Sequence, residues 1–223
     1  MKTGDGRARL SDNTGDGMKK NNVITVVVGF IETNCYVVPS EADNCVYIID
    51  PGGDFDKIMK AVKELNCDLK NYRILLTHGH VDHISTINEF MDKLPVSLLY
   101  LHKDDHFLYM SSENALPPWI PALKNPPVPS GDISGCEFTM IHTPGHTRGG
   151  VCFYFKRIPA LFSGDTIFRH SVGRTDLPGG DQNSLVESIN KKIFTLPKNL
   201  TIFPGHGPST TVGEEKKANP FLN

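Results

Sequence analysis

A short loop, LLTHGHVDHI at residues 75–84, follows an apolar run and holds more metal-binding groups than one ion needs. Its pattern is His78-x-His80-x-Asp82-His83. Imidazole and carboxylate groups are ligands that Zn²⁺, Fe²⁺ and Mn²⁺ take in proteins. Alternate residues of an extended loop point the same way, so His78 and His80 can share one ion. Asp82 and His83 lie past that pair and can turn toward a second ion, which makes this loop a candidate for half of a two-metal site.

Four side chains cannot complete two metal sites, so further ligands must come from other segments. Three later segments, HTPGHT, SGDT and PGHG, follow expected strands, and each places a polar side chain next to glycine. Glycine lets the backbone turn sharply and approach a neighbour closely. The candidate ligands from these segments are His146, Asp165 and His206. A lone histidine beside a turn is usually a surface or hydrogen-bonded residue, and this interpretation applies to His102, His106, His142 and His170.

The motifs THGHVDH, TPGHT, SGDTIF, GRTDLPGGD and PGHGPSTT together resemble those of the metallo-β-lactamase superfamily. Within it, the chain is similar to the short, single-domain members of the glyoxalase II-like (hydroxyacylglutathione hydrolase-like) enzymes. The resemblance extends over residues 23–223 and implies the αββα fold of the family. It also implies how the seven ligands divide: His78, His80 and His146 would hold the first metal, Asp82, His83 and His206 the second, and Asp165 would bridge them.

This ligand set implies a hydrolase that uses two divalent metal ions, expected to be zinc, with iron and manganese as alternatives. Metal binding lowers the pKa of water from about 15.7 toward about 7, which supplies a hydroxide for attack on a carbonyl carbon. Asp82 and Asp165 are the expected catalytic residues, because they would orient that nucleophile as well as bind metal. A thiol with a pKa of about 8.5 leaves without protonation. A small-molecule thioester of the hydroxyacylglutathione type is therefore the expected substrate.

Other activities fit the same residues. Persulfide dioxygenases share these ligand motifs but use one iron for redox chemistry, and lactonases and other ester hydrolases belong to the same superfamily. Several true β-lactamases of the superfamily carry a cysteine at the place of Asp165. The aspartate here therefore favours the glyoxalase-like, lactonase-like or nuclease-like branches. A metal-dependent scaffold or sensor without catalysis is a further alternative.

One arginine, Arg174 in GRTDLPGGD, stands where glyoxalase II-like enzymes carry a basic residue near the glutathione moiety. A guanidinium binds a carboxylate well, so Arg174 is the candidate substrate-binding residue. The competing interpretation is an internal ion pair with Asp176 or Asp181 that braces the loop. Full-length glyoxalase II has a C-terminal helical extension, for which this chain, ending at NPFLN, has no room. The proline-rich segment 111–131 is then the candidate lid or pocket wall.

The ligand segments must be held by an alternation of short strands and helices. Runs of β-branched and aromatic residues broken by turn residues predict strands, and apolar residues at helical spacing predict helices. Two β-rich halves with helices outside them predict an α/β fold, a four-layer αββα sandwich. The expected strands are 23–29, 34–39, 45–50, 72–77, 96–101, 136–142, 150–155, 160–164 and 200–203. The expected helices are 55–66, 84–93, 103–110, 183–195 and 213–218.

The composition is that of one globular domain. Residues 1–21 are rich in Gly, Asp and Lys and are expected to be a disordered tail or an added leader sequence, followed by a hydrolase domain at 22–223. No Lys/Arg run is long enough to predict nucleic acid as a partner. No stretch has the length of a membrane span or the pattern of a signal peptide, so the cytoplasm is the expected location, with no membrane partner. The five scattered cysteines are expected to be reduced.

Overall fold

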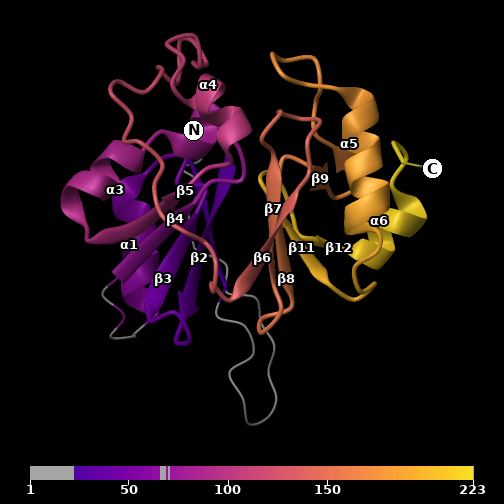
Figure 1. Ribbon diagram of the computed structural model, residues 1–223, viewed down its shortest axis with the longest axis horizontal. Coiled ribbons are helices and arrows are strands. Elements are labelled where there is room, and N and C mark those ends of the chain that lie inside the picture. The colour runs from indigo at the N-terminus through magenta and orange to yellow at the C-terminus, as the bar shows by residue number, and fades with distance from the viewer. Residues whose placement is uncertain (1–22, 66–68, 70, 223) are drawn as a thin grey trace, which may run out of the picture.

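A computed structural model describes residues 23–65, 69 and 71–222, and the tail expected at residues 1–21 lies outside them. Two five-stranded sheets face each other, and helices cover the outer side of each sheet (Figure 1). The predicted four-layer αββα sandwich is confirmed. The two sheets come from successive halves of the chain, so any site between them takes residues from both halves.

The first sheet has the strand order β1-β2-β3-β4-β5. Its first three strands pair antiparallel, and β4 and β5 are added in parallel. Two helices, α1 (Phe55–Glu64) and α3 (Ile87–Lys93), cover its outer face (Figure 1). The strand bounds are β1 Ile24–Val28, β2 Thr33–Ser40, β3 Cys45–Ile49, β4 Asn71–Leu75 and β5 Val96–Tyr100.

The second sheet has the order β12-β11-β8-β7-β6, in which only β8 and β11 pair in parallel. Its outer face is covered by α5 (Gln182–Ser188), which continues as a π-helical turn η2 (Ile189–Ile193), and by α6 (Val212–Ala218). The strand bounds are β6 Phe138–His142, β7 Val151–Phe155, β8 Ala160–Gly164, β11 Thr201–Pro204 and β12 Thr210–Thr211. A separate two-stranded ribbon joins β9 (Ile167–Phe168) to β10 (Ser171–Val172).

Several strands, such as β3, are continuous apolar runs that are buried on both faces. Successive side chains of a strand point to opposite faces of the sheet. In β3, Tyr47 and Ile49 lie in the core between the sheets, whereas Val46 and Ile48 lie in the core under the helices. The sandwich therefore has one core between its sheets and one beneath each helical layer.

One edge of the sandwich collects the carboxyl ends of the parallel strands. Strands β3 and β4 pair in parallel in the first sheet, as β8 and β11 do in the second. Hydrogen bonds join the two halves there: Val151 N donates to Thr77 O at 2.8 Å, and Asn34 N donates to Gly205 O at 2.7 Å. The polar strand ends identified in the sequence therefore meet at this edge.

The boundaries of several elements differ from the sequence prediction. The helix expected over 84–93 is two helices, α2 (Val81–Ile84) and α3, and the one expected over 103–110 is the 3-10 turn η1 (Lys103–Asp105) followed by α4 (His106–Tyr109). The described segment 111–131 holds no helix and no extended strand, as predicted. Within the described part of the chain, no helix has the length and apolar character to span a membrane. Four cysteines are free thiols, namely Cys35, Cys45, Cys136 and Cys152.

Candidate metal centre

The loop between β4 and α2 carries the first four candidate ligands. His78 and His80 lie in the loop itself, and Asp82 and His83 lie in the short helix α2. Two buried side chains fix the backbone between them, because Asp105 Oδ2 accepts a hydrogen bond from Gly79 N at 3.0 Å, and Asn114 Oδ1 accepts one from Val81 N at 3.1 Å. The loop is held from outside, which leaves its imidazoles free to face the opposite half of the molecule.

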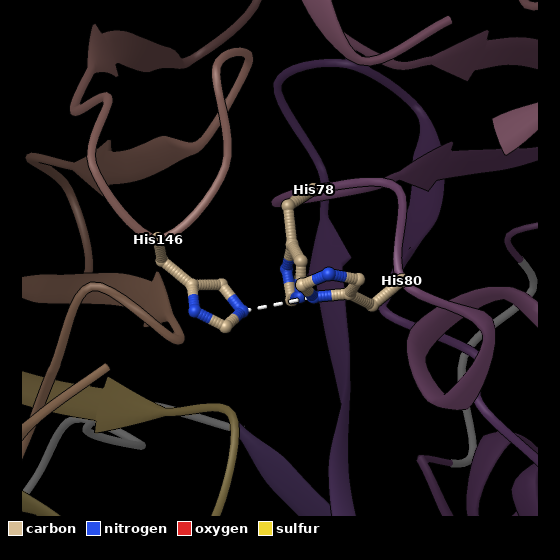
Figure 2. Close-up of side chains that lie close together, drawn as sticks. All are labelled: His78, His80 and His146. Carbon is tan, nitrogen blue, oxygen red and sulfur yellow. Dashed lines mark hydrogen bonds between the residues drawn. The ribbon is translucent and has the colours of Figure 1, made fainter. Parts of the chain in front are cut away.

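The first group of candidate ligands combines His78 and His80 with His146 from the loop after β6. One ligand atom of each lies within 4.8 Å of the others. Figure 2 shows His146 reaching across from the second half of the chain toward the other two. His80 Nδ1 and His146 Nε2 are 2.9 Å apart, and His146 Nδ1 is 2.7 Å from the backbone oxygen of Arg174. A carbonyl only accepts, so His146 Nδ1 carries a proton, and its Nε2, which faces His80, is the nitrogen that could bind a metal.

The second group combines Asp82 and His83 with His206, which follows β11. Asp82 Oδ2 is 3.2 Å from His83 Nε2 and 3.3 Å from His206 Nε2. The backbone of His206 is tied to β2 by an isolated bridge to Thr33, whose hydroxyl donates to Asp82 Oδ2 at 3.3 Å. This group, too, is assembled from both halves of the chain.

Asp165, at the end of β8, lies between the two groups. Its carboxylate oxygens are 3.6 Å from His146 Nε2 in the first group, and 3.4 Å and 3.7 Å from the Nε2 atoms of His83 and His206 in the second. This is the position that a bridging carboxylate needs. All seven residues singled out in the sequence therefore meet at one place.

Two observations show that metal ions fit these residues: the chemical type of the donor atoms, and the absence of hydrogen-bond partners for some of them. Three buried polar atoms in the described residues of the centre have no hydrogen-bond partner: His78 Nε2, His83 Nε2 and Asp165 Oδ1. A buried polar atom without a partner costs about 1–3 kcal/mol. An ion coordinated by these atoms would remove that cost, and imidazole with carboxylate is a donor set that zinc, iron and manganese accept.

The protonation states of most ligands suit metal binding. Burial, together with the neighbouring imidazoles, lowers the pKa of His78 well below its ordinary value and that of His80 to about 4. Burial acts to raise the pKa of Asp165, but the nearby histidines, first of all His83, outweigh it and lower the pKa to about 2. Neutral imidazoles and ionised carboxylates are the forms that coordinate metals.

Two ligands are exceptions, His206 and His83. Burial acts to lower the pKa of His206, but Asp82 and Asp165 outweigh it and raise the pKa above its ordinary value. The rise is larger for His83. Burial acts to lower its pKa, but Asp82, Asp165 and Asp50 surround the ring and raise the pKa well above its ordinary value. The protonated His83 ring supplies, between these carboxylates, the positive charge that a bound metal ion would supply. A metal ion would replace that proton.

Asp50 is a supporting residue that the sequence analysis missed. It is 1% exposed and accepts hydrogen bonds from Thr77 N at 2.8 Å and Thr77 Oγ1 at 2.6 Å. Its Oδ2 is also 2.9 Å from His83 Nδ1, which directs the other ring nitrogen toward Asp82 and Asp165. In the sequence Asp50 belongs to a DPGG turn, and nothing in that pattern distinguishes it from an ordinary turn aspartate.

A second buried carboxylate, Asp105, connects the two ligand loops. It accepts hydrogen bonds from Gly79 N, Thr147 Oγ1 at 2.7 Å and Gly149 N at 2.6 Å. Gly79 lies between His78 and His80, and Thr147 follows His146. Asp105 therefore sets the spacing between the loops that supply the first group.

Arg174 makes the internal pair that was the alternative to substrate binding. Its Nε and Nη2 donate to the two carboxylate oxygens of Asp176 at 2.8 Å and 2.7 Å. Asp181 instead accepts from Ser184 N and caps α5. The Arg174 and Asp176 side chains are 62% and 65% exposed. Such a pair contributes about 0–1 kcal/mol, so little energy opposes its exchange for another carboxylate.

Gly205 must be glycine for the centre to form. A Cβ atom there would collide with Asp165 Oδ1 and lie 2.7 Å from His83 Cε1. We expect Gly205→Ala to displace both ligands and lower turnover by about 10²-fold, the effect of roughly 1 Å of misplacement. Gly207→Ala is the control for backbone strain without a collision, because Gly207 has a φ of +73° but its Cβ would meet no atom within 4 Å. Metal content and turnover measured on both variants test this, and equal activities would contradict it.

The chain belongs to the metallo-β-lactamase superfamily, whose family model matches residues 28–206. Hydroxyacylglutathione hydrolase GloC of Haemophilus influenzae is 34% identical over 215 residues, which cover 91% of this chain and 98% of GloC. Two solved structures each align with 89% of this chain. TTHA1623 in a di-iron-bound form has 36% identity and a TM-score of 0.76 over 99% of its length. The BLEG-1 B3 metallo-β-lactamase has 38% identity and a TM-score of 0.74 over 98% of its length.

Proposed function

We propose that this protein is a metal-dependent hydrolase of small-molecule thioesters of the hydroxyacylglutathione type, with two divalent ions, expected to be zinc. The observation that carries the proposal is the position of Asp165 between two groups of ligands, each of which could hold one ion. The similarity to GloC over nearly the whole length of that enzyme supports the choice of substrate class.

The seven side chains would divide as follows in the proposed enzyme. His78, His80 and His146 would hold the first ion, Asp82, His83 and His206 the second, and Asp165 would bridge them. Two ions held in this way supply Lewis acidity toward a carbonyl oxygen and lower the pKa of water. The carboxylates of Asp82 and Asp165 accept hydrogen bonds and would orient the attacking water. Asp50 and Asp105 would keep the ligands in place.

A thioester suits these residues because its leaving group does not need a proton donor. A thiol with a pKa of about 8.5 departs as a thiolate at neutral pH without a proton donor. An amine or alkoxide leaving group needs a proton as the bond breaks. The ionised carboxylates and metal-facing imidazoles of the centre are poorly suited to donate one, which favours thioesters over amides.

Arg174 is proposed to bind a carboxylate of the substrate in exchange for Asp176. Hydrogen bonds to charged groups contribute about 1.5–3 kcal/mol, so Arg174→Ala is expected to raise KM for S-D-lactoylglutathione about tenfold or more. KM for a simple thioester that lacks the glutathione carboxylates should stay unchanged. Asp176→Asn is the matched control, because it breaks the internal pair but keeps the arginine. Unchanged KM for both substrates in Arg174→Ala would show that Arg174 does not bind the substrate.

One other substrate class and one other metal have specific support. The 38% identity to BLEG-1, described as a B3 metallo-β-lactamase, makes a β-lactam the second candidate substrate. The di-iron form of TTHA1623 makes iron the second candidate metal. A single iron per chain would point instead to the persulfide oxidation considered from the sequence.

One preparation can separate these activities. Protein purified without added metal is analysed for metal content and then assayed with S-D-lactoylglutathione, a simple thioester, a lactone, a cephalosporin and a persulfide. Two zinc ions with thioester turnover are the expected result. One iron per chain with persulfide consumption would overturn the hydrolase proposal. Two metals with cephalosporin turnover alone would overturn the choice of substrate.

A further inference from the structure

A second group of metal-binding side chains lies outside the centre described above. His102 follows β5, Asp104 lies in the 3-10 turn η1, and His142 ends β6. The three can each offer one ligand atom within 4.8 Å of the others. The sequence analysis treated both histidines as isolated, and they are 40 positions apart in the chain; the fold stacks their rings, with centroids 4.2 Å apart and planes at 15°.

The hydrogen bonds of the two rings indicate which nitrogen of each could bind a metal. His142 Nε2 is 2.9 Å from the backbone oxygen of Arg148. A carbonyl only accepts, so Nε2 carries a proton and Nδ1 is the nitrogen that could bind a metal. His102 Nδ1 accepts only a long hydrogen bond of 3.4 Å, from Asp104 N, which a metal ion could replace. A histidine whose other ring nitrogen donates to a backbone carbonyl is the usual arrangement of a metal ligand.

His102 Nδ1 and the Asp104 carboxylate face each other as two acceptors. Asp104 Oδ2 is 3.7 Å from His102 Nδ1. Zinc binds nitrogen and oxygen at about 2.0–2.2 Å, which puts two tetrahedral ligands roughly 3.4 Å apart. Burial, and then the neighbouring His142, lower the pKa of His102, so the ring is the neutral form that a metal needs. A cation between these atoms would relieve the repulsion between two lone pairs.

The charges around the group are mixed, and solvent can reach it. Asp105 adds to the negative charge of Asp104, whereas Lys103 acts against a cation, as does the Lys192 ammonium that donates to His142 O at 2.6 Å. The Asp104 side chain is 46% exposed. His102 lines one surface pocket and Asp104 another, so an ion and its waters have access from both sides.

We propose that His102, Asp104 and His142 form a peripheral site for one divalent transition metal ion, separate from the two-metal centre. Two imidazoles and one carboxylate favour zinc, nickel or copper over magnesium or calcium, with water in the open position. The ion would link the turn after β5 in the first half to the end of β6 in the second.

The test uses the full-length protein with its centre loaded with zinc. Further Zn²⁺ is added alone, and binding is followed by equilibrium dialysis with metal analysis and by calorimetry. Wild-type protein is expected to take one additional zinc per chain. His142→Gln and Asp104→Asn should weaken this additional site tenfold or more, while thioester turnover and the zinc already bound at the centre stay at wild-type levels. Asp104 is half-exposed, so its variant tests the site without disturbing the core.

His170→Gln is the matched control, because His170 is an exposed histidine that pairs with a carboxylate, Glu214, elsewhere on the surface. It should keep the additional zinc. The proposal is overturned if wild-type protein takes no additional zinc, or if all three variants bind it equally. Wild-type protein without thioester turnover would count against the proposed hydrolase but not against this site, because zinc binding and turnover are measured separately.

Discussion

Asp165→Ala is expected to strip metal from both positions and to lower thioester turnover by about 10³-fold or more. The carboxylate lies within 3.7 Å of ligand nitrogens in both groups, so its loss removes a donor from each. Metal coordination contributes several kcal/mol to stabilising the transition state, and each 1.36 kcal/mol is a factor of ten in rate. Metal analysis of the purified variant, together with its turnover, measures both effects.

Comparison of His206→Ala with Asp165→Ala distinguishes a residue that binds one ion from a residue that bridges two. His206 contacts Asp82 and Asp165 in the second group, so its variant should lose mainly one ion. His170→Gln controls for the removal of any histidine and should keep both. If Asp165→Ala and His206→Ala lost the same amount of metal, Asp165 would not be a bridge.

Asp50→Asn is expected to weaken metal binding at the second position by about 10–100-fold, the usual effect of removing a group that orients a ligand. Asp50 Oδ2 lies 2.9 Å from His83 Nδ1 and accepts from Thr77 Oγ1, while Oδ1 accepts from Thr77 N. A carboxamide has only one acceptor oxygen, so its NH₂ group would face a donor on one side. Binding at the first position should change much less. Metal titration of the variant, followed by calorimetry, would resolve the two positions.

Asp54→Asn is the control for this variant. Asp54 lies four residues farther along the same turn, is exposed, and accepts a hydrogen bond from Gly29 N rather than from a candidate ligand. It should bind metal as the wild type does. If Asp50→Asn bound metal at both positions with wild-type affinity, the Asp50 carboxylate would not be needed to orient His83.

The sequence predicted the sandwich well because its strands are buried on both faces. Runs such as CVYII at 45–49 and ALF at 160–162 are apolar without interruption, which marks them as strands of the two sheets. Two-residue strands such as β9, β10 and β12 carry too few side chains to show a period. Helices α2 and α3 are separated at Ser85 and Thr86. The hydroxyls of these two residues donate to the backbone oxygens of Gly52 and Pro51.

The ligands were identifiable in the sequence because they are clustered or follow strands beside glycine, and the fold brings all seven together. Their supports were not. Asp50, Asp105 and Asn114 act through hydrogen bonds to residues 26 to 44 positions away, and each has an ordinary polar neighbourhood in the sequence. His102 and His142 were set aside for the same reason. Only tertiary contacts distinguish such residues from surface ones.

Asp82 and His83 belong to the first half of the chain, whereas His146, Asp165 and His206 belong to the second, and this division has a consequence for biosynthesis. During translation the first sheet emerges before the second, because synthesis runs from the N-terminus. Three of the four residues around the first metal position have been made once residue 146 has emerged, but the second position waits for residue 206. The two ions would then be acquired in order, and a nascent chain would hold a half-built centre until its last strands dock.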